Sequence, residues 1–139
     1  IDPESKTIAI KEFENRASQV NPALSPAATE ALKDKFLSQT SLGLVNGDAD
    51  LMFEGSIVNY AVSAQAVQAN ETAATNRFTV KIKVKFTNKQ VPDYDFETTF
   101  SAFRDFPADS DFTGLEDGMV EEILKDITED IFNKAVVNW

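Results

Sequence analysis

Hydrophobic and polar residues alternate strictly along residues 77–89, where the even positions from 78 to 86 are Phe, Val, Ile, Val and Phe. The odd positions carry only Arg, Thr and Lys side chains. This alternation predicts a half-buried strand with one apolar face and one basic face. Residues 94–102 alternate in the same way after a short turn around Pro92, so the two segments are expected to form an antiparallel hairpin.

Two further segments have strand patterns. Residues 6–13 alternate around Ile8 and Ile10, and residues 51–62 place Leu51, Phe53 and Ile57 on one face. Gly55 within the second segment indicates either a bulge or a close packing contact. Residues 15–24, 63–76 and 105–112 are polar, so we expect loops or connections there.

Two segments repeat apolar residues at helical spacing. The first is expected at residues 25–41, with Ser25 as the N-cap, Pro26 at the first helical position, and a stripe formed by Ala28, Leu32 and Phe36. The second begins at Thr113, which forms a capping-box pattern with Glu116. Its apolar stripe consists of Val120, Ile123, Leu124, Ile127, Ile131 and Ala135.

These elements follow the order β-α-β-β-β-α. One-sided strands and amphipathic helices bury each other's apolar surface when both helices pack on one face of one sheet. The expected fold class is therefore α+β, a two-layer sandwich with a four-stranded mixed sheet and two helices on one face. A length of 139 residues suits a single domain, 1–139.

Composition excludes several kinds of chemistry. The chain has no cysteine and no histidine, which removes disulfides, thiol nucleophiles and the commonest metal ligand and general base. No run of about 18 apolar residues is present, as a membrane-spanning helix would need. The sequence starts at Ile1 rather than Met, and we expect a processed chain whose targeting segment lies upstream.

Charge is unevenly distributed along the chain. The formal net charge is -10, yet residues 77–89 carry five positive charges and no negative one. Residues 105–139 hold ten acids and two bases. The molecule is therefore expected to be electrically two-sided, which affects the choice of partners rather than the fold.

The basic face of residues 77–89 has two interpretations. It is either a solvated sheet face, with Asp95 and Glu97 as cross-strand partners, or a docking surface for anions. In the second case the binding residues are Arg77, Lys81, Lys83 and Lys85, and Arg77 is the one able to hold a phosphate through two hydrogen bonds. Nucleic acid is disfavoured as a ligand, because the net charge of the protein is strongly negative and no exposed aromatic residues alternate with the lysines and arginine of this face.

Other acidic groups give weaker indications. Asp48, Asp50 and Glu54 lack the ligand pattern of a calcium loop, so a polar turn is the favoured interpretation. The pairs Glu121-Glu122 and Glu129-Asp130 are typical of a solvated helix face. Since no phosphate loop, nucleophile elbow or metal-ligand spacing occurs, we expect a non-enzymatic protein with no catalytic residue, no metal and no cofactor.

The sequence also resembles a known family over nearly its whole length. It is similar to the LptE-like lipopolysaccharide-assembly lipoproteins of the Bacteroidetes type. The segments that carry this resemblance are residues 6–16, 21–25, 29–36, 49–57, 76–80, 100–103 and 130–139, the last ending in Trp139.

The resemblance implies a fold, a location and partners. It implies two helices on one face of a four-stranded sheet, in agreement with the periodicity. It further implies a lipid anchor upstream of Ile1, attachment to the periplasmic side of the outer membrane, and support or plugging of an LptD-type β-barrel translocon. Direct contact with lipopolysaccharide through the basic strand is a further expectation, nominated on charge.

Two alternatives remain open at this level. One is a purely structural protein-interaction domain, whose surface meets only protein. The other is a surface polysaccharide-binding lipoprotein, which needs exposed aromatic platforms; the candidates are Tyr60, Tyr94, Phe103 and Trp139.

Overall fold

The computed structural model describes residues 5–17, 21–66 and 74–136. Trp139 and the middle parts of two expected connections, residues 18–20 and 67–73, therefore lie outside the described residues. The elements are β1 (Thr7–Ile10), β2 (Glu14–Asn15), α1 (Leu24–Gln39), β3 (Gly43–Leu44), β4 (Leu51–Ala64), β5 (Thr75–Asn88), η1 (Pro92–Tyr94), β6 (Phe96–Pro107) and α2 (Phe112–Val136).

The strands form one mixed sheet in the order β3-β1-β4-β5-β6, with β2 pairing separately with β4. β1 runs parallel to β3 and β4, whereas β4, β5 and β6 form an antiparallel meander. The α+β class and the order of the long elements are confirmed. The expected number of four strands is wrong, because β2 and β3 are two residues long and too short to show a periodicity.

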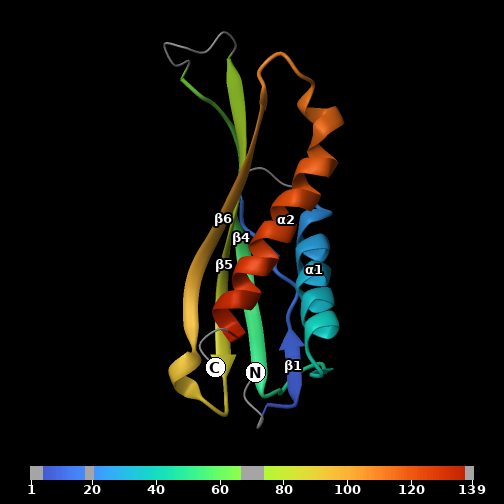
Figure 1. The fold of residues 1–139 in the computed structure, drawn as a ribbon, viewed down its shortest axis with the longest axis vertical. Helices are drawn as coiled ribbons and strands as arrows, with labels where there is room; N and C mark the ends of the chain where they lie inside the picture. The colour runs from blue at the N-terminus through green and yellow to red at the C-terminus, as the bar shows by residue number, and fades with distance from the viewer. Residues whose placement is uncertain (1–4, 18–20, 67–73, 137–139) are drawn as a thin grey trace.

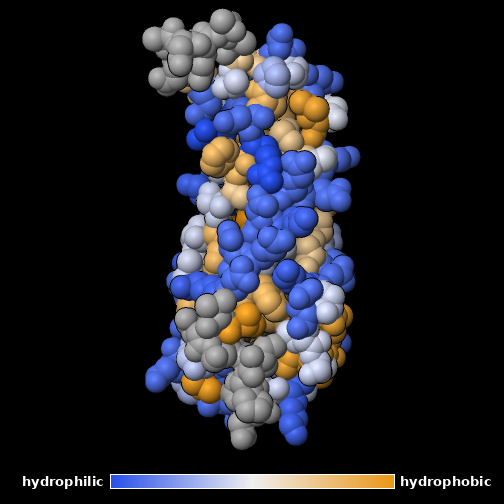
Figure 2. All heavy atoms as spheres, in the orientation of Figure 1, coloured by the Kyte–Doolittle hydropathy of each residue, from blue (hydrophilic) through white to orange (hydrophobic). Residues whose placement is uncertain are grey.

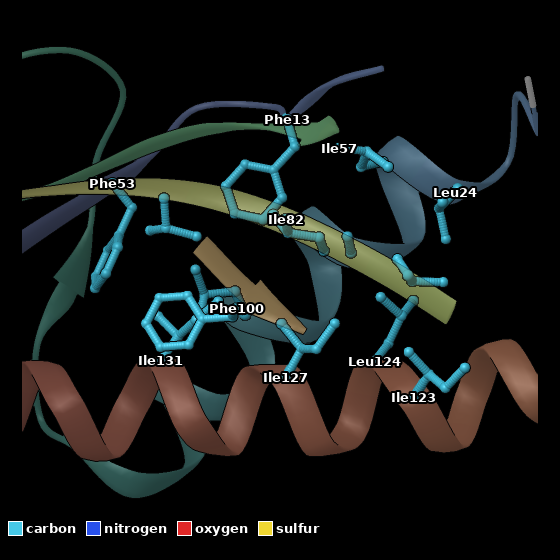
Figure 3. Close-up of a cluster of buried hydrophobic side chains, with 14 of the residues drawn as sticks. Phe13, Leu24, Phe53, Ile57, Ile82, Phe100, Ile123, Leu124, Ile127 and Ile131 are labelled. Atoms are coloured by element: carbon cyan, nitrogen blue, oxygen red, sulfur yellow. The ribbon is translucent and has the colours of Figure 1, made fainter. Parts of the chain in front are cut away.

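Both helices lie on the same face of the sheet and run in the same direction (Figure 1). The five apolar residues of β5 from Phe78 to Phe86 are at most 1% exposed, as the alternation predicts. Ile123, Ile127 and Ile131 of α2 point from the helix toward the sheet, and Phe100 of β6 lies beside Ile131 (Figure 3). The core is therefore the layer between this sheet face and the two helices.

The central hairpin is longer than the pattern predicts. β4 continues to Ala64 and β5 starts at Thr75, and Ser63 pairs with Arg77 and Ala64 with Asn76. β6 likewise extends through Pro107, into the segment expected to be a loop. Backbone pairing persists here although the side chains are small or polar, so hydrophobic patterning underestimates the strand length.

Both expected helix caps are wrong. The backbone N–H of Thr113 donates to Oδ1 of Asp111 at 3.1 Å, so Asp111, rather than Thr113, caps α2. Helix α1 begins at Leu24 without a side-chain cap, while the Asn21 side chain accepts a hydrogen bond from the N–H of Ala23 at 3.1 Å. Each helix therefore starts before the expected position. At α2 the Asp111 side chain binds a free N–H group of the first turn, whereas at α1 the Asn21 side chain binds the N–H of Ala23, just ahead of the helix.

No helix in the described ranges is both long and apolar enough to cross a membrane.

Candidate anion-binding face

The four nominated residues lie on the sheet face opposite the helices, here called the outer face. Lys81, Lys83 and Lys85 are exposed, and Arg77 is half-buried. Their apolar neighbours on β5 point the other way, into the core. We call Arg77, Lys81, Lys83 and Lys85 the basic row; the strand pleat brings them onto one line.

Two lysines of the basic row are partly neutralised by acids on neighbouring strands. Lys83 lies 3.6 Å from a carboxylate oxygen of Glu97 on β6, and Lys85 lies 3.9 Å from one of Glu54 on β4. Glu54 also pairs with Lys11 at 3.5 Å. These side chains are about half exposed, and such surface pairs contribute roughly 0–1 kcal/mol each. They therefore lower the local charge without fixing the lysines firmly.

Arg77 is held in place by two neighbours. Its Nε and Nη2 donate to the two carboxylate oxygens of Asp105 at 2.8 and 3.1 Å. The guanidinium also lies over the ring of Phe103, 3.9 Å from its centroid. These hydrogen bonds lower the pKa of Asp105 and raise the pKa of Arg77. Arg77 would have to leave Asp105 to bind a phosphate through two hydrogen bonds.

Lys81 is the member of the basic row that has no ion pair or hydrogen bond among the described residues. Its cross-strand neighbours are Asn59 on β4 and Ser101 on β6, both uncharged. Lys81 is therefore the point of the outer face at which an anion meets a cation without displacing an acid.

Of the two acids expected to pair with the basic row, Asp95 and Glu97, only Glu97 does so. Glu97 pairs with the basic row, but Oδ1 of Asp95 accepts a hydrogen bond from the backbone N–H of Asn88 at 2.6 Å. Asp95 precedes β6 and holds the turn after β5, so it is no partner of the row. Glu54 and Lys11 were missed, since only the register of β4 against β5 and β1 brings them to this surface.

The three acids of the candidate calcium cluster, Asp48, Asp50 and Glu54, each have different partners. Asp48 pairs with Lys89, and Glu54 belongs to the outer face. Asp50 accepts hydrogen bonds from the N–H groups of Lys6 and Thr7, and the bond from Lys6 is the main cause of its lowered pKa. The described residues include no group of three or more acids placed to hold a metal ion.

The acid pairs of α2 are also separated. Glu122 and Asp126 both bind Arg104 of β6, at 3.0 and 2.8 Å. Arg104 thereby ties the edge strand to the helix. Glu121 and Asp130 are exposed, as expected of a solvated helix face.

The three aromatic candidates among the described residues do not form a platform, and Trp139 lies outside those residues. Tyr60 is 5% exposed, and its ring packs edge-on against Phe78 in the core. Tyr94 is half-buried, and Phe103 is 46% exposed but carries the Arg77 guanidinium on its ring. The arrangement gives no support to stacking of a sugar ring between exposed aromatics.

The architecture places the chain in a class of two-layer α+β domains also found in bacterial lipoproteins of known structure. A minor lipoprotein from Acinetobacter baumannii superimposes with a TM-score of 0.63 at 13% identity, covering 96% of this chain and 94% of that chain. The rare lipoprotein B from Shewanella oneidensis gives 0.59 at 9% identity, covering 94% and 95%. An uncharacterized lipoprotein B from Nitrosomonas europaea gives 0.58 at 10% identity, covering 96% and 82%. At these identities the similarity shows the fold alone.

The family follows from a separate comparison. The family model for LptE, lipopolysaccharide assembly, matches residues 5–135. The chain belongs to this family, so the resemblance to LptE-like proteins is confirmed and the chain has a role in lipopolysaccharide assembly. No curated protein matches the chain.

Proposed function

We propose that this domain is a non-enzymatic, lipid-anchored component on the periplasmic side of the outer membrane. There it supports or plugs an LptD-type β-barrel and offers its outer face to lipopolysaccharide. The anchor would lie upstream of Ile1. Membership of the LptE family and the lipoprotein fold support this proposal.

The basic row carries the part of the proposal that concerns lipopolysaccharide. An acidic domain of net charge -10 exposes a line of cations on a sheet face to which neither helix contributes. Lys81 and Lys85 are four residues apart, which is about 13 Å along a strand. A ligand with more than one anionic group therefore fits the row better than a single phosphate ion does.

The members of the row should contribute unequally. Lys81 has no acidic partner to give up among the described residues, whereas Arg77 would lose two hydrogen bonds to Asp105. Lys83 and Lys85 would exchange weak surface pairs for an anion. We therefore assign Lys81 the largest share of the binding and Arg77 the smallest.

The test compares lipopolysaccharide binding by the wild-type domain and by the triple variant Lys81→Glu/Lys83→Glu/Lys85→Glu. A matched control, Lys33→Glu/Lys125→Glu/Lys134→Glu, makes the same charge change on the helical layer. A charge-assisted hydrogen bond is worth about 1.5–3 kcal/mol, so the first variant should bind at least about tenfold more weakly. Circular dichroism verifies that both variants are folded.

Equal weakening by both triple variants would reduce the effect to net charge and remove the basic row from the mechanism. Single substitutions refine the assignment: Lys81→Ala should weaken binding more than Arg77→Ala. A larger effect of Arg77→Ala would show that the pair with Asp105 opens to receive the ligand.

The barrel partner requires a different experiment. The full-length lipoprotein is tagged, cross-linked in cells and purified from outer membranes, and an LptD-type barrel should co-purify. Absence of the barrel from the purified material would contradict the supporting or plugging role. Recovery of the barrel without measurable lipopolysaccharide affinity would favour the purely structural alternative, in which the ion pairs of the outer face become contacts to protein.

A further inference from the structure

A groove of about 970 Å³ separates α1 and α2 on the side of the helices that faces away from the sheet. Most residues of the inward stripes are used in the core, whereas Val120 and Leu124 at the border of the α2 stripe also line this groove. It runs from Ala27 to Ser38 on α1 and from Asp117 to Glu129 on α2. We call it the interhelical groove. Figure 2 shows that hydrophilic side chains predominate over the middle of the surface where α2 lies, with smaller apolar patches exposed among them.

The floor of the interhelical groove is made of small and apolar residues. Ala27 and Ala31 line it on α1, and Gly118, Val120 and Leu124 line it on α2. Small residues let the backbone of another helix approach closely, as in helix–helix contacts of 8–10 Å. The groove therefore has the shape and the surface chemistry of a helix-packing seam that lacks its third member.

Gly118 has no packing role within the described chain. A Cβ added at this position would meet no atom within 4 Å. Glycine in a helix interior is unfavourable, because it loses the most backbone freedom on folding. An open space over a helical glycine on the wall of a groove is explained by an outside group that comes close to the backbone there.

The rim of the groove is acidic. It contains the carboxylates Asp34, Asp117, Glu121, Glu122 and Glu129 and the two cations Lys35 and Lys125, a formal balance of -3. Of these acids only Glu122 forms an ion pair within the described residues. The other four have no ion-pair or hydrogen-bond partner there, so the rim is complementary to positive charge.

We propose that the interhelical groove docks a short basic amphipathic helix of a partner protein. The groove spans about 12 residues on each wall, about 18 Å at 1.5 Å per residue, which matches three helical turns. The apolar face of the partner lies on the floor, and its lysines or arginines meet the four unpaired acids. This is helix-in-groove recognition, in which an amphipathic helix lays its apolar face into a hydrophobic groove. The proposal does not depend on lipopolysaccharide binding, which concerns the opposite layer of the molecule.

The chemistry of the lining argues against two other kinds of occupant. A polar small molecule would find no free donor at Thr128, because its hydroxyl already donates within its own helix, to carbonyl oxygens of Leu124 and Lys125. Neither wall is a strand edge, so a β-strand would find no backbone groups with which to pair. A cationic helix is the occupant that satisfies both the floor and the rim.

The probe is a fluorescein-labelled 14-residue helical peptide with a leucine stripe flanked by lysines; the control peptide has glutamates in place of the lysines. Affinity is measured by fluorescence anisotropy at low salt. The wild-type domain should bind the lysine peptide and not the glutamate peptide. Gly118→Trp, which fills the groove, should weaken binding at least about tenfold, whereas Gly118→Ala, which adds only one methyl group against the docked helix, should weaken it clearly less.

A second pair of variants tests the rim. Glu121→Lys/Glu129→Lys should weaken binding at least about tenfold. The control Asp93→Lys/Asp109→Lys makes the same charge change outside the groove and should leave most of the affinity. Thermal melts by circular dichroism verify folding, and the charge pair decides the matter if Gly118→Trp fails to fold.

Three outcomes would overturn the proposal. The wild-type domain fails to bind the lysine peptide. The two charge-reversal pairs weaken binding equally, which shows attraction to net charge alone. A folded Gly118→Trp variant binds as well as Gly118→Ala does, which places the peptide elsewhere on the surface.

Discussion

Two glycines of this chain occupy opposite environments at the scale of single residues. A Cβ on Gly55 of β4 would lie 2.3 Å from the backbone carbonyl oxygen of Lys83 on β5. The oxygen belongs to the backbone of β5, which pairs with β4 and β6, so it cannot move away as a flexible side chain does. We predict that Gly55→Ala lowers the free energy of unfolding by about 1–3 kcal/mol, because β4 and β5 must separate locally. Urea denaturation followed by circular dichroism measures this change.

The same substitution at Gly118 is the matched comparison. Its Cβ would enter open space on the surface of α2. Gly118→Ala should therefore raise the free energy of unfolding by about 0.5–1 kcal/mol through helix propensity. Changes of the same sign at both positions would contradict the environments assigned to these residues.

Tyr60 links three parts of the fold through its hydroxyl. The hydroxyl donates to a carboxylate oxygen of Glu116 on α2 and accepts a hydrogen bond at 3.1 Å from the side chain of Asn21, which precedes α1. We predict that Tyr60→Phe costs about 1–2 kcal/mol of stability, because it leaves two polar groups without their partner. Chemical denaturation at pH 7 measures the loss, and an unchanged midpoint would show that water replaces the hydroxyl fully.

The pH dependence gives Tyr60 a second signature. Burial, together with the hydrogen bond to Glu116, raises the pKa of Tyr60 from 10.0 to about 12. Its folded-state pKa lies above the unfolded value, so its contribution to stability is complete below pH 10 and falls as pH rises from 10 to 12. The difference in stability between the wild type and Tyr60→Phe should therefore shrink over that window. A constant difference would contradict the raised pKa.

At the scale of elements, the start of α2 depends on one carboxylate. Asp111 accepts the hydrogen bond from the N–H of Thr113, and its charge lies at the positive end of the helix dipole. We predict that Asp111→Ala lowers the free energy of unfolding by about 1 kcal/mol. Thr113→Ala, which removes the side chain expected from the sequence to be the cap, should cost much less. Thermal denaturation of both variants distinguishes the two, and a larger loss for Thr113→Ala would restore the capping box.

The sequence predicts elements well where side chains alternate against a core. The burial of Phe78, Val80 and Ile82 follows from the pattern alone, as does the exposure of Lys81 on the opposite face. The sequence pattern does not predict features that depend on backbone pairing, such as the position of a bulge. The register shift between Ile57 and Asn59 lies two residues beyond Gly55, so Gly55 marks a close contact and not the bulge.

The same limit applies to the candidate site. The row of cations follows from period two, but its partners depend on register. No local signal places Glu54 beside Lys85 or Phe103 under Arg77, because both contacts cross between strands. The sequence therefore identifies a basic face but not which of its members is unpaired.

At the scale of the whole molecule, the two layers differ in how their charges are paired. On the outer face most cations have an acid within reach, and Lys81 is the exception among the described members of the basic row. On the helical layer the excess is acidic, and several carboxylates at the interhelical groove are unpaired. The molecule thus offers a place for an anion on one side and for a cation on the other, as two separate binding surfaces require.

Unpaired acids on a molecule of net charge -10 should reduce its stability at low salt. Asp117, Glu121 and Glu129 lie along one groove. Two unit charges of the same sign repel each other by about 1 kcal/mol at about 4 Å in water, and the repulsion falls in inverse proportion to their distance. We predict that Asp117→Asn/Glu121→Gln/Glu129→Gln raises Tm by about 3–5 °C at low ionic strength. Added NaCl should raise the Tm of the wild type more than that of the variant, since the Debye length falls to about 10 Å at 0.1 M. Scanning calorimetry across a salt series tests this, and equal salt responses would show that these carboxylates have favourable partners and are not available to a cationic helix.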